Sequence, residues 1–426
     1  ADCILINTSN TNPKMEVRMK KRTMKMRKIA GLSRRLAALM MIVVFALSGT
    51  ALTGCGSDNK TAQNTSGDAK QYDGKLEFDH TMELKYAKLF KVDYYKGGYK
   101  MLTITNRDED TAIVDKETKL LIVPDGMSTP SVDSNVIVLK APVTNMLVSS
   151  TPVTSLMNAS NCLSNISQVT YNKDEWYIDD VKKAFDNNKL TYIGNYKEPD
   201  YELIVAGAPS IAVYSTMLSS VPEVAAKLKE LGVNYILDQS TYEEEPLGRV
   251  EWSKFYAAFC DQEESAEKMF NQQDEYITKL SNVEKTGKKV AVFYITSKGK
   301  LYVRNAGDYL AKMVNMAGGE YIFDNLNTDK TGTQTMEMEK FYDTAKDADY
   351  IIYIWSLGGK PSTLADFTGY NSTLSEFKAV KEGNVWCTTP DFFQIADTIG
   401  SMVNDINLML NADANTSELT YLKKLK

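Results

Sequence analysis

Apolar positions along this chain change their spacing several times, and each change predicts a different kind of structure. A long apolar run, LAALMMIVVFAL, lies within residues 36–54 and follows a strongly basic stretch. Residues 56–75 are polar, rich in Ser, Thr, Asn, Asp and Gly, and lack an apolar period that could form a core. Beyond them, short apolar runs and helical periods alternate to the end. The pattern predicts a leader, a disordered tether and a folded part.

The folded part begins with a β-like pattern over residues 82–126. The runs LFKVDYY and YKMLTIT flank Lys96-Gly97-Gly98, which predicts a hairpin with a glycine turn. The segment KLLIVPDG predicts a further short strand. We expect these strands to form a β-rich extension of the first lobe, and its role stays open.

Strands and helices alternate from residue 136 onwards. The first series predicts strands in NVIVLK, NMLVSS, LTYIG, SIAVY and VNYILD, and helices in TSLMNASNCLSNI, YELIVAG and VPEVAAKLKELG. The second series predicts strands in KKVAVFYIT, DYIIYIW and NVWCTT, and helices in AGDYLAKMVNMAGG, MEMEKFYDTAKDA, STLSEFKAV and IADTIGSMVNDINLML. Such alternation is typical of a largely parallel sheet covered on both faces. The fold class is therefore α/β, with two Rossmann-like lobes in series.

A long helical stretch separates the two series, and from residue 262 to residue 283 it contains neither Gly nor Pro. PLGRVEWSKFYAAFC predicts one helix, and Asp261 with Glu264 forms a capping-box-like start for a second, QEESAEKMFNQQDEYITKLSNV. At 1.5 Å per residue the second helix spans roughly 33 Å. We expect a first lobe over residues 81–260, a connecting helix over 261–285 and a second lobe over 286–426. Because helices bend at Pro, Gly or bulges, the cleft between the lobes is expected to be largely preformed.

The N-terminal stretches have the order of a secretory signal peptide, with basic residues, an apolar core and small residues. The apolar core ends in LTGC at Cys55, which resembles the bacterial lipobox. This resemblance implies a signal peptide over residues 1–54, lipid on the Cys55 thiol and a lipidated tether over 55–80. Methionines at 15, 19 and 24 are plausible starts, so the first fourteen residues are expected to be upstream coding sequence. An uncleaved membrane anchor is the alternative.

Removal of the predicted signal peptide changes the net charge of the chain, and the signal peptide also predicts where the protein is located. Ten of the 49 basic and two of the 55 acidic residues lie before residue 55, so the rest has 39 basic and 53 acidic side chains and a formal net charge of −14. An acidic soluble part argues against nucleic acid as a partner. The predicted location is extracytoplasmic and membrane-anchored, on the surface of a Gram-positive-type bacterium or on the periplasmic side.

Cysteine and histidine usage restricts the chemistry. Cys162, Cys260 and Cys387 are far apart in the sequence and lack metal-type spacing, which predicts buried apolar thiols without disulfides. His80 is the only histidine, which excludes a His-rich metal site. Ser-His-Asp or Cys-His catalysis would have to use His80, and no GxSxG, Walker A or HExxH pattern is present. We therefore expect no enzyme, no resident metal and no cofactor.

Several segments, in a fixed order after about residue 82, carry a family resemblance. They are PDYELIVAGAPS at 199–210, PLGRVEW at 246–252, AGDY at 306–309 followed by GG at 318–319, and GNVW at 383–386. Together they resemble the substrate-binding proteins of ABC importers for ferric siderophores, cobalamin and haem. The resemblance implies two lobes joined by one backbone helix, the class III periplasmic-binding-protein architecture. The β-rich region 82–126 departs from the family pattern.

The resemblance also implies partners. They are an ABC permease dimer with a cytoplasmic ATPase, a small-molecule metal chelate and the membrane, reached through the lipid anchor by a monomeric protein. One exposed Glu on each lobe would dock to the permease, and by position these are Glu202 and Glu339, with Glu337 competing for the second role. The alternative is that both acids simply favour helix N-termini.

The ligand is expected between the lobes, at the C-terminal ends of the strands. The candidate contacts are Ser150, Thr151, Tyr214, Ser215, Tyr242, Arg304, Trp355, Trp386 and Phe392. A ferric siderophore is the first choice, because Arg304 could pair with an anionic chelate. Cobalamin or haem on the same scaffold are alternatives, and a surface adhesin or glycan-binding lipoprotein is an alternative from another class.

Overall fold

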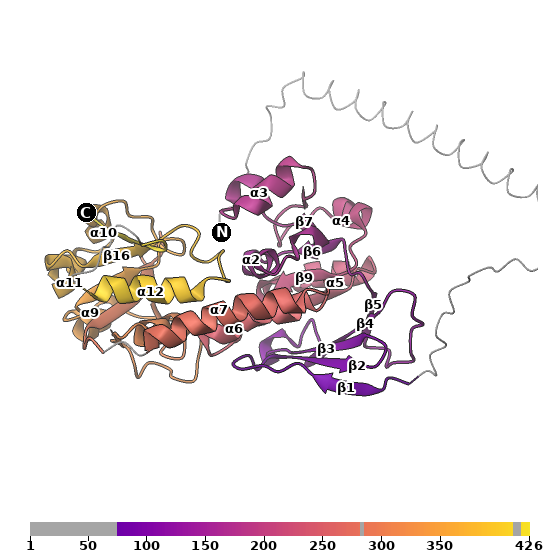
Figure 1. Cartoon of the computed structure of the whole chain (residues 1–426). Coiled ribbons are helices and arrows are strands. Elements are labelled where there is room, and N and C mark those ends of the chain that lie inside the picture. Colours follow the sequence, from indigo (N-terminus) through magenta and orange to yellow (C-terminus); the bar gives the residue numbers. More distant parts are fainter. Residues whose placement is uncertain (1–74, 282–284, 412–418) are drawn as a thin grey trace, which may run out of the picture. The chain divides into compact units, whose positions relative to one another are not determined.

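A computed structural model describes residues 75–281, 285–411 and 419–426 (Figure 1). The predicted signal peptide, the lipidation site Cys55 and most of the predicted tether lie outside these residues. Within them, no helix is both long enough and apolar enough to cross a membrane.

The β-rich extension forms one sheet with the strand order β1-β2-β3-β4-β5. The strands are β1 (Phe78–Thr81), β2 (Phe90–Tyr95), β3 (Tyr99–Thr105), β4 (Glu117–Val123) and β5 (Ile137–Lys140). Gly97 and Gly98 turn the predicted β2–β3 hairpin at φ +83° and +85°, a region that L side chains rarely adopt. The segment NVIVLK was expected in the parallel sheet of the first lobe, but as β5 it pairs with β4. The extension therefore continues to residue 140.

The first lobe contains a parallel sheet with the order β10-β9-β6-β7-β8. Its strands are β6 (Met146–Val148), β7 (Ile166–Val169), β8 (Thr191–Tyr192), β9 (Ala212–Ser215) and β10 (Tyr235–Asp238). The helices are α2 (Thr151–Ala159), α3 (Asp179–Asp186), α4 (Tyr201–Gly207) and α5 (Pro222–Glu230). This alternation confirms the parallel sheet that the pattern predicts, although β7 was not among the predicted strands.

The second lobe has the strand order β14-β12-β11-β15-β16-β17, with β13 beside β11. The strands are β11 (Lys289–Ile295), β12 (Leu301–Arg304), β13 (Glu320–Tyr321), β14 (Thr333–Thr335), β15 (Tyr350–Tyr353), β16 (Val385–Thr388) and β17 (Leu422–Lys424). The helices are α8 (Tyr309–Met316), α9 (Met338–Ala345), α10 (Leu364–Gly369), α11 (Lys378–Lys381) and α12 (Ile399–Leu410). β11, β13, β15 and β16 are parallel, whereas β12, β14 and β17 pair antiparallel at the two sides.

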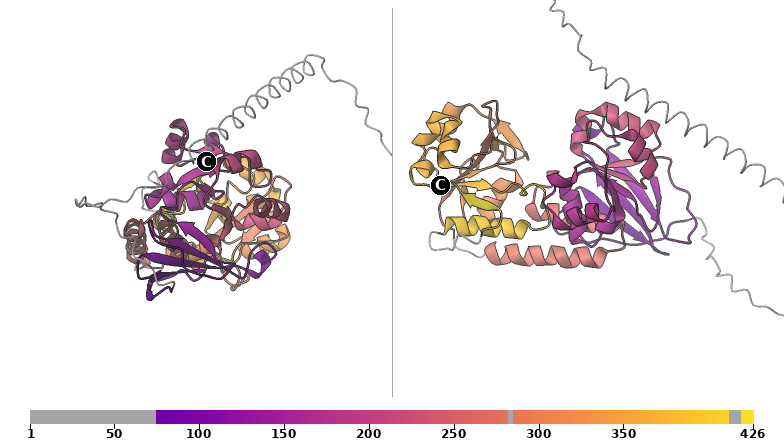
Figure 2. Two further views of the ribbon diagram at one scale, coloured as in Figure 1. Left: turned by 90° about the vertical axis from the view of Figure 1, so that its right-hand side faces the viewer. Right: turned by 90° about the horizontal axis from the view of Figure 1, so that it is seen from above.

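Two consecutive helices, α6 (Pro246–Ala257) and α7 (Glu263–Ser281), connect the lobes. α7 contributes Ala266 to the core of the first lobe, and Phe270 and Ile277 to the core of the second. It packs along α6 and α12, the yellow helix beside it in Figure 2. The fold class of two α/β lobes, a connecting helix and an N-terminal β-rich extension is confirmed.

The extension shares its core with the first lobe. Phe90 of β2 packs against Trp252 and Phe255 of α6, with ring centroids 5.0 and 5.4 Å apart. Apolar side chains from β2, β3, β4 and β5 belong to the same buried cluster as those of α2 and α6. The extension is therefore part of the lobe's hydrophobic core and not a separately folded module.

Two buried carboxylates bind the chain between β1 and β2 to the region of α6. Glu251, which is fully buried, accepts hydrogen bonds from the backbone N–H groups of residues 85, 86 and 87, each at 2.8 Å. Glu243 accepts from the backbone N–H groups of residues 88 and 89 and from the indole N–H of Trp252. Gly248 allows the close approach, since a Cβ there would lie 3.3 Å from the carbonyl oxygen of Tyr86. We call residues 85–89 with these two acids the carboxylate clamp.

Candidate functional site

A pocket opens between the lobes, where the strand ends of the first lobe face α8 and the chain after β16. From the first lobe it is lined by Pro152 of α2, Thr241 of the 3₁₀ turn Ser240–Tyr242 and Arg249 of α6. Tyr309 of α8 and Phe392 line it from the second lobe. Its volume is about 70 Å³, far below the roughly 300–1,000 Å³ of pockets that hold small-molecule ligands. The expected preformed cleft is therefore not found, and a bulky ligand requires the lobes to move apart.

Hydrogen bonds join the lobes beside this pocket through residues 391–398, which we call the bridging segment. Ser155 of α2 donates to the carboxylate of Asp397 and accepts from the backbone N–H of Ala396 at 3.1 Å. The side chain of Gln394 accepts from the backbone N–H of Tyr177 at 2.9 Å and donates to the carbonyl of Glu175 at 2.7 Å. Burial raises the pKa of Asp397, while the bond from Ser155 acts in the opposite direction. Opening of the lobes must break these bonds.

The geometry of two lobes with a pocket between them agrees with a comparison against protein families. The family model described as periplasmic binding protein matches residues 166–392, more than half of the chain. The chain belongs to the periplasmic binding protein family. Members of this family are solute-binding proteins, so this chain is a solute-binding protein and not an enzyme.

Two relatives of this periplasmic binding protein span almost its whole length. An uncharacterized lipoprotein of Methanocaldococcus jannaschii is 29% identical over 401 residues, which cover 90% of this chain and 95% of the relative. A second uncharacterized lipoprotein of that organism is 28% identical over 415 residues, covering 92% and 99%. The lipoprotein name of both relatives agrees with an extracytoplasmic location.

Solved structures share the fold. A periplasmic binding protein from Veillonella parvula superposes with a TM-score of 0.52 at 18% identity, covering 68% of this chain and 97% of the other. An ABC transporter substrate-binding protein from Listeria monocytogenes gives a TM-score of 0.50 at 16% identity, covering 63% and 98%. These matches place the chain in the fold of ABC importer substrate-binding proteins, and at such identities they concern the fold alone.

Arg249 is a functional candidate of this periplasmic binding protein that the sequence reasoning missed. Its guanidinium carbon lies 3.7 Å from the centroid of the Tyr309 ring, across the pocket from its own helix. Burial raises the pKa of the Tyr309 phenol, while the charge of Arg249 acts in the opposite direction. Among the described residues no carboxylate forms an ion pair with Arg249. Burial raises the pKa of Asp238, and the charge of Arg249 acts in the opposite direction. The pocket thus has apolar and aromatic walls with one cation not paired to a carboxylate.

Arg304, the predicted anion partner, has a different environment. It is buried at the end of β12 and forms an ion pair with Asp308 at 3.4 Å. Asp308 is also held by the backbone N–H groups of Leu310 and Gly332. The Arg304 guanidinium lies 5.5 Å from the ring of Phe393, which lines the pocket. Arg304 therefore contacts Asp308 and Phe393 and does not line the pocket as it stands, and a direct contact with the ligand stays a prediction.

Tyr214 and Trp386 are core residues in the structure, which removes the reason to expect them at the ligand. Tyr214 of β9 is fully buried in the cluster formed with α4 and α5, and burial raises the pKa of its phenol. Trp386 of β16 is buried in the core of the second lobe. Side chains alternate between the two faces of a strand, and because both faces of a parallel sheet are covered, a residue within the strand is buried whichever face it is on.

The other candidates differ in how near they lie to the pocket. Phe392 lines it, and Thr151 and Tyr242 each adjoin a lining residue in the sequence. Ser150 is buried directly before α2, where its carbonyl accepts from Thr154. Ser215, the last residue of β9, and Trp355, two residues after β15, do not line the pocket as it stands. Their roles stay predictions.

The predicted docking acids are both exposed, each on its own lobe. Glu202 lies in the first turn of α4, whose N-cap is Asp200, and Glu339 lies in the first turn of α9. Glu337, the competing acid, is also exposed and directly precedes α9. Since Asp200 already caps α4, the Glu202 carboxylate is not needed for capping.

The histidine and the cysteines of the described residues do not line the pocket. No group of three or more His, Cys, Asp or Glu residues that could hold a metal occurs among the described residues. His80 is exposed on β1 and stacks on Tyr94. Cys162 and Cys260 are far apart in the sequence but are neighbours in the structure. The pKa of Cys260 is raised, mainly by a hydrogen bond with Cys162 and to a smaller extent by burial. Burial raises the pKa of Cys387 to about 12.

Proposed function

We propose that this protein captures an anionic metal chelate between its lobes and delivers it to an ABC permease dimer driven by a cytoplasmic ATPase. A ferric siderophore is the first choice, with cobalamin and haem as alternatives on the same scaffold. The protein acts as a monomer held to the membrane by lipid on Cys55.

The observation that carries this proposal is the placement of Arg249. A half-buried guanidinium in an aromatic and apolar pocket suits a ligand that is both anionic and bulky. Such a ligand can accept hydrogen bonds from the guanidinium and stack on the aromatic rings. The same pocket offers no cluster of carboxylates or imidazoles for a bare metal ion among the described residues. A metal ion that arrives already coordinated needs no such cluster.

Thermal unfolding in the presence of candidate ligands tests the proposal. Purified protein is heated with a ferric catecholate chelate, a ferric hydroxamate chelate, haem, cobalamin and neutral oligosaccharides. A ligand at a hundredfold excess over its Kd stabilises the folded state by about 2.7 kcal/mol, which raises the apparent Tm. We expect a ferric chelate to do this. Stabilisation by oligosaccharides alone would instead favour a glycan-binding lipoprotein.

The anchor gives a prediction of its own. We expect Cys55→Ala to release the protein from the membrane and to abolish lipid labelling, because the substituted residue has no thiol to receive a lipid. Fractionation of cells and metabolic labelling with a fatty acid measure this, with Cys387→Ala as the control that removes a buried thiol. A Cys55→Ala protein that stays membrane-bound and processed as in wild type contradicts the lipidation site.

The docking acids give another prediction. We expect Glu202→Lys and Glu339→Lys to leave chelate affinity unchanged and to reduce transport, because a like charge would face basic residues of the permease. Exposed charges act mainly on association rate and are screened by salt, so the difference from wild type should shrink at high ionic strength. Uptake of radioactive iron measures the effect, with Glu337→Lys distinguishing the two acids beside α9. Loss of chelate binding would place the substituted Glu in the cleft instead.

A further inference from the structure

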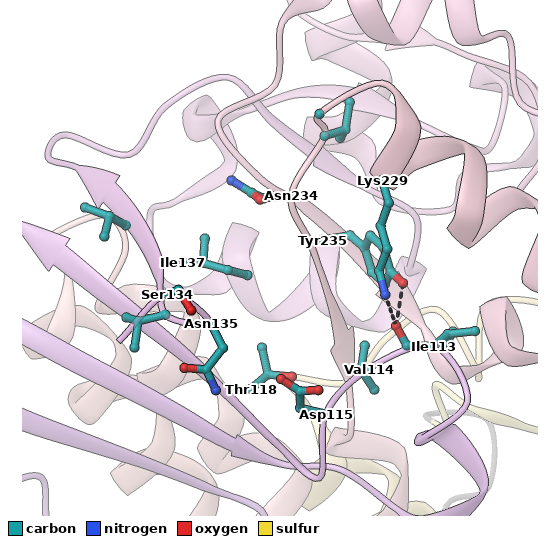
Figure 3. A pocket seen from close by; sticks show the side chains of 14 residues that line it. Ile113, Val114, Asp115, Thr118, Ser134, Asn135, Ile137, Lys229, Asn234 and Tyr235 are labelled. Carbon is teal, nitrogen blue, oxygen red and sulfur yellow. Dashed lines mark hydrogen bonds between the residues drawn. The ribbon is translucent and has the colours of Figure 1, made fainter. Parts of the chain in front are cut away.

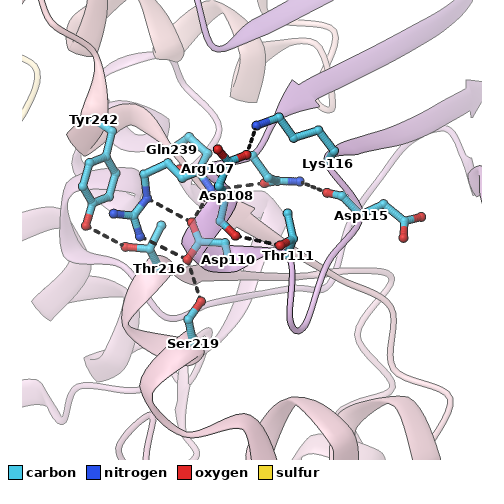
Figure 4. A network of polar contacts seen from close by, with 11 residues as sticks. Arg107, Asp108, Asp110, Thr111, Asp115, Lys116, Thr216, Ser219, Gln239 and Tyr242 are labelled. Carbon is cyan, nitrogen blue, oxygen red and sulfur yellow. Dashed lines mark hydrogen bonds and ion pairs between the residues drawn. The ribbon is translucent and has the colours of Figure 1, made fainter.

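The loop between β3 and β4 connects the extension to the strand ends of the first lobe. Gln239, directly after β10, donates to the side chain of Asn106 at 3.1 Å and to Asp110 at 3.0 Å (Figure 4). Ser219, in the turn after β9, donates to Asp110 at 2.6 Å. The extension therefore reaches the edge of the sheet at which the ligand site is expected. We call residues 106–116 the crossing loop.

The far side of the crossing loop is fixed as well. The ammonium of Lys229 and the hydroxyl of Tyr235 both donate to the carbonyl oxygen of Ile113, at 2.9 and 2.7 Å (Figure 3). These contacts lie in the wall of a groove of about 470 Å³ between β5 and β10. A loop held at both ends by hydrogen bonds presents its remaining side chains in a defined position, which reduces the entropy lost on binding.

The side chain so presented is Arg107. Its Nε and Nη2 donate to the two oxygens of Asp110, each at 3.1 Å, and its guanidinium carbon lies 3.6 Å from the centroid of the Tyr242 ring. Asp110 is fully buried and accepts four hydrogen bonds, two from Arg107 and one each from Ser219 and Gln239. This matches the acceptor capacity of a carboxylate, so Asp110 holds the guanidinium in one orientation.

Arg107 is also accessible. A quarter of its side chain is exposed, and the contacts to Asp110 use only one edge of the guanidinium. Tyr242, on which it stacks, directly follows Thr241 in the pocket wall. A purely structural ion pair would not need this combination of a fixed fork, a stacked aromatic ring and an exposed edge next to the pocket.

We propose that Arg107 and Tyr242 form a specificity-determining edge of the ligand site, at which the extension recognises a peripheral anionic group of the chelate. This inference rests on the proposed function and gives the extension a role in it. Arg249 then contacts the ligand inside the pocket, and Arg107 binds the peripheral anionic group of the ligand at the rim of the pocket. A chelate without a peripheral anion gains nothing from Arg107.

Paired affinities test this proposal. Fluorescence titration of the full folded chain measures the Kd of a trianionic ferric tris-catecholate and of a neutral ferric tris-hydroxamate. Arg107→Gln keeps a donor for Asp110 but loses the charge and the fork, so we expect about tenfold weaker binding of the catecholate, as for loss of a hydrogen bond to a charged group. Binding of the hydroxamate should stay within about twofold of wild type.

Two further variants complete the test. Lys116→Ala removes an exposed cation of the same loop that is paired with Asp108, and both affinities should be unchanged. Arg107→Lys keeps the charge without the fork and should weaken only catecholate binding, by about threefold; it serves if Arg107→Gln does not fold. An equal loss for both chelates, or no loss, overturns the role of Arg107 while leaving the proposed function intact. Wild-type protein that binds neither chelate overturns both.

Discussion

Replacement of Glu251 by Ala is expected to lower the free energy of unfolding by about 3–5 kcal/mol. The carboxylate is fully buried and accepts from three backbone N–H groups of the carboxylate clamp and from Lys254. Its removal leaves buried donors without a partner, each costing about 1–3 kcal/mol, and takes one partner from a buried ion pair. The strand β2 that follows the clamp would lose its attachment beside α6.

Urea unfolding followed by circular dichroism measures this loss. Glu244→Ala is the matched control, because that residue is exposed and its ion pair with Lys88 spans 3.4 Å at the surface, so a change below about 0.5 kcal/mol is expected. Glu251→Gln keeps one acceptor and should fall between the two. A midpoint for Glu251→Ala equal to that of the control would contradict a stabilising role for the clamp.

The second large effect concerns the ligand. We expect Arg249→Ala to weaken binding of an anionic ferric chelate by roughly 10–100-fold, because hydrogen bonds to charged groups contribute about 1.5–3 kcal/mol. The substitution also removes the stacking partner of Tyr309, so the apolar wall of the pocket loses a flat surface. A single contact of this size is typical of an anchoring residue in a binding site.

Arg249→Lys separates the contribution of the positive charge to ligand affinity from that of the planar guanidinium. It keeps the cation but loses the planar fork, so affinity should lie between those of wild type and Arg249→Ala. Lys227→Ala is the control, since it removes an exposed cation of α5 paired with Glu230 at 2.7 Å. Each Kd is measured by fluorescence titration, and the Tm of each variant shows whether it is folded. Wild-type affinity of Arg249→Ala would exclude it from the ligand site.

The order of elements could be read from the sequence because apolar period and turn residues are local signals. The helix α4 and the β2–β3 hairpin follow from such signals. Pairing between distant segments is not local, which is why β5 was assigned to the wrong sheet. The predicted helix STLSEFKAV is interrupted at Phe377, whose backbone is extended at φ −69° and ψ 141°. The apolar pattern alone did not indicate that break.

The site was harder to predict than the fold. A residue at a strand end can face the pocket or the core, and the sequence does not distinguish Phe392, which lines the pocket, from the buried Tyr214. Arg304 was preferred as the only Arg near a second-lobe strand end, yet Asp308 four residues later is its partner. Arg249 lies within the segment PLGRVEW, and Glu245 four residues earlier was an apparent partner, but in the structure Glu245 pairs with Lys312. Arg107 depends on contacts across 135 residues of chain, as its stacking on Tyr242 shows.

The carboxylate clamp has a mechanical consequence for a protein pulled from its N-terminal side. The described chain enters through β1, which pairs with β2, and the clamp begins at residue 85, so tension that passes β1 is transmitted to α6 through Glu251. α6 contributes side chains to the cores of both lobes. The load therefore acts on the first lobe and α6 and not on the bridging segment, so it does not strain the hydrogen bonds that join the lobes.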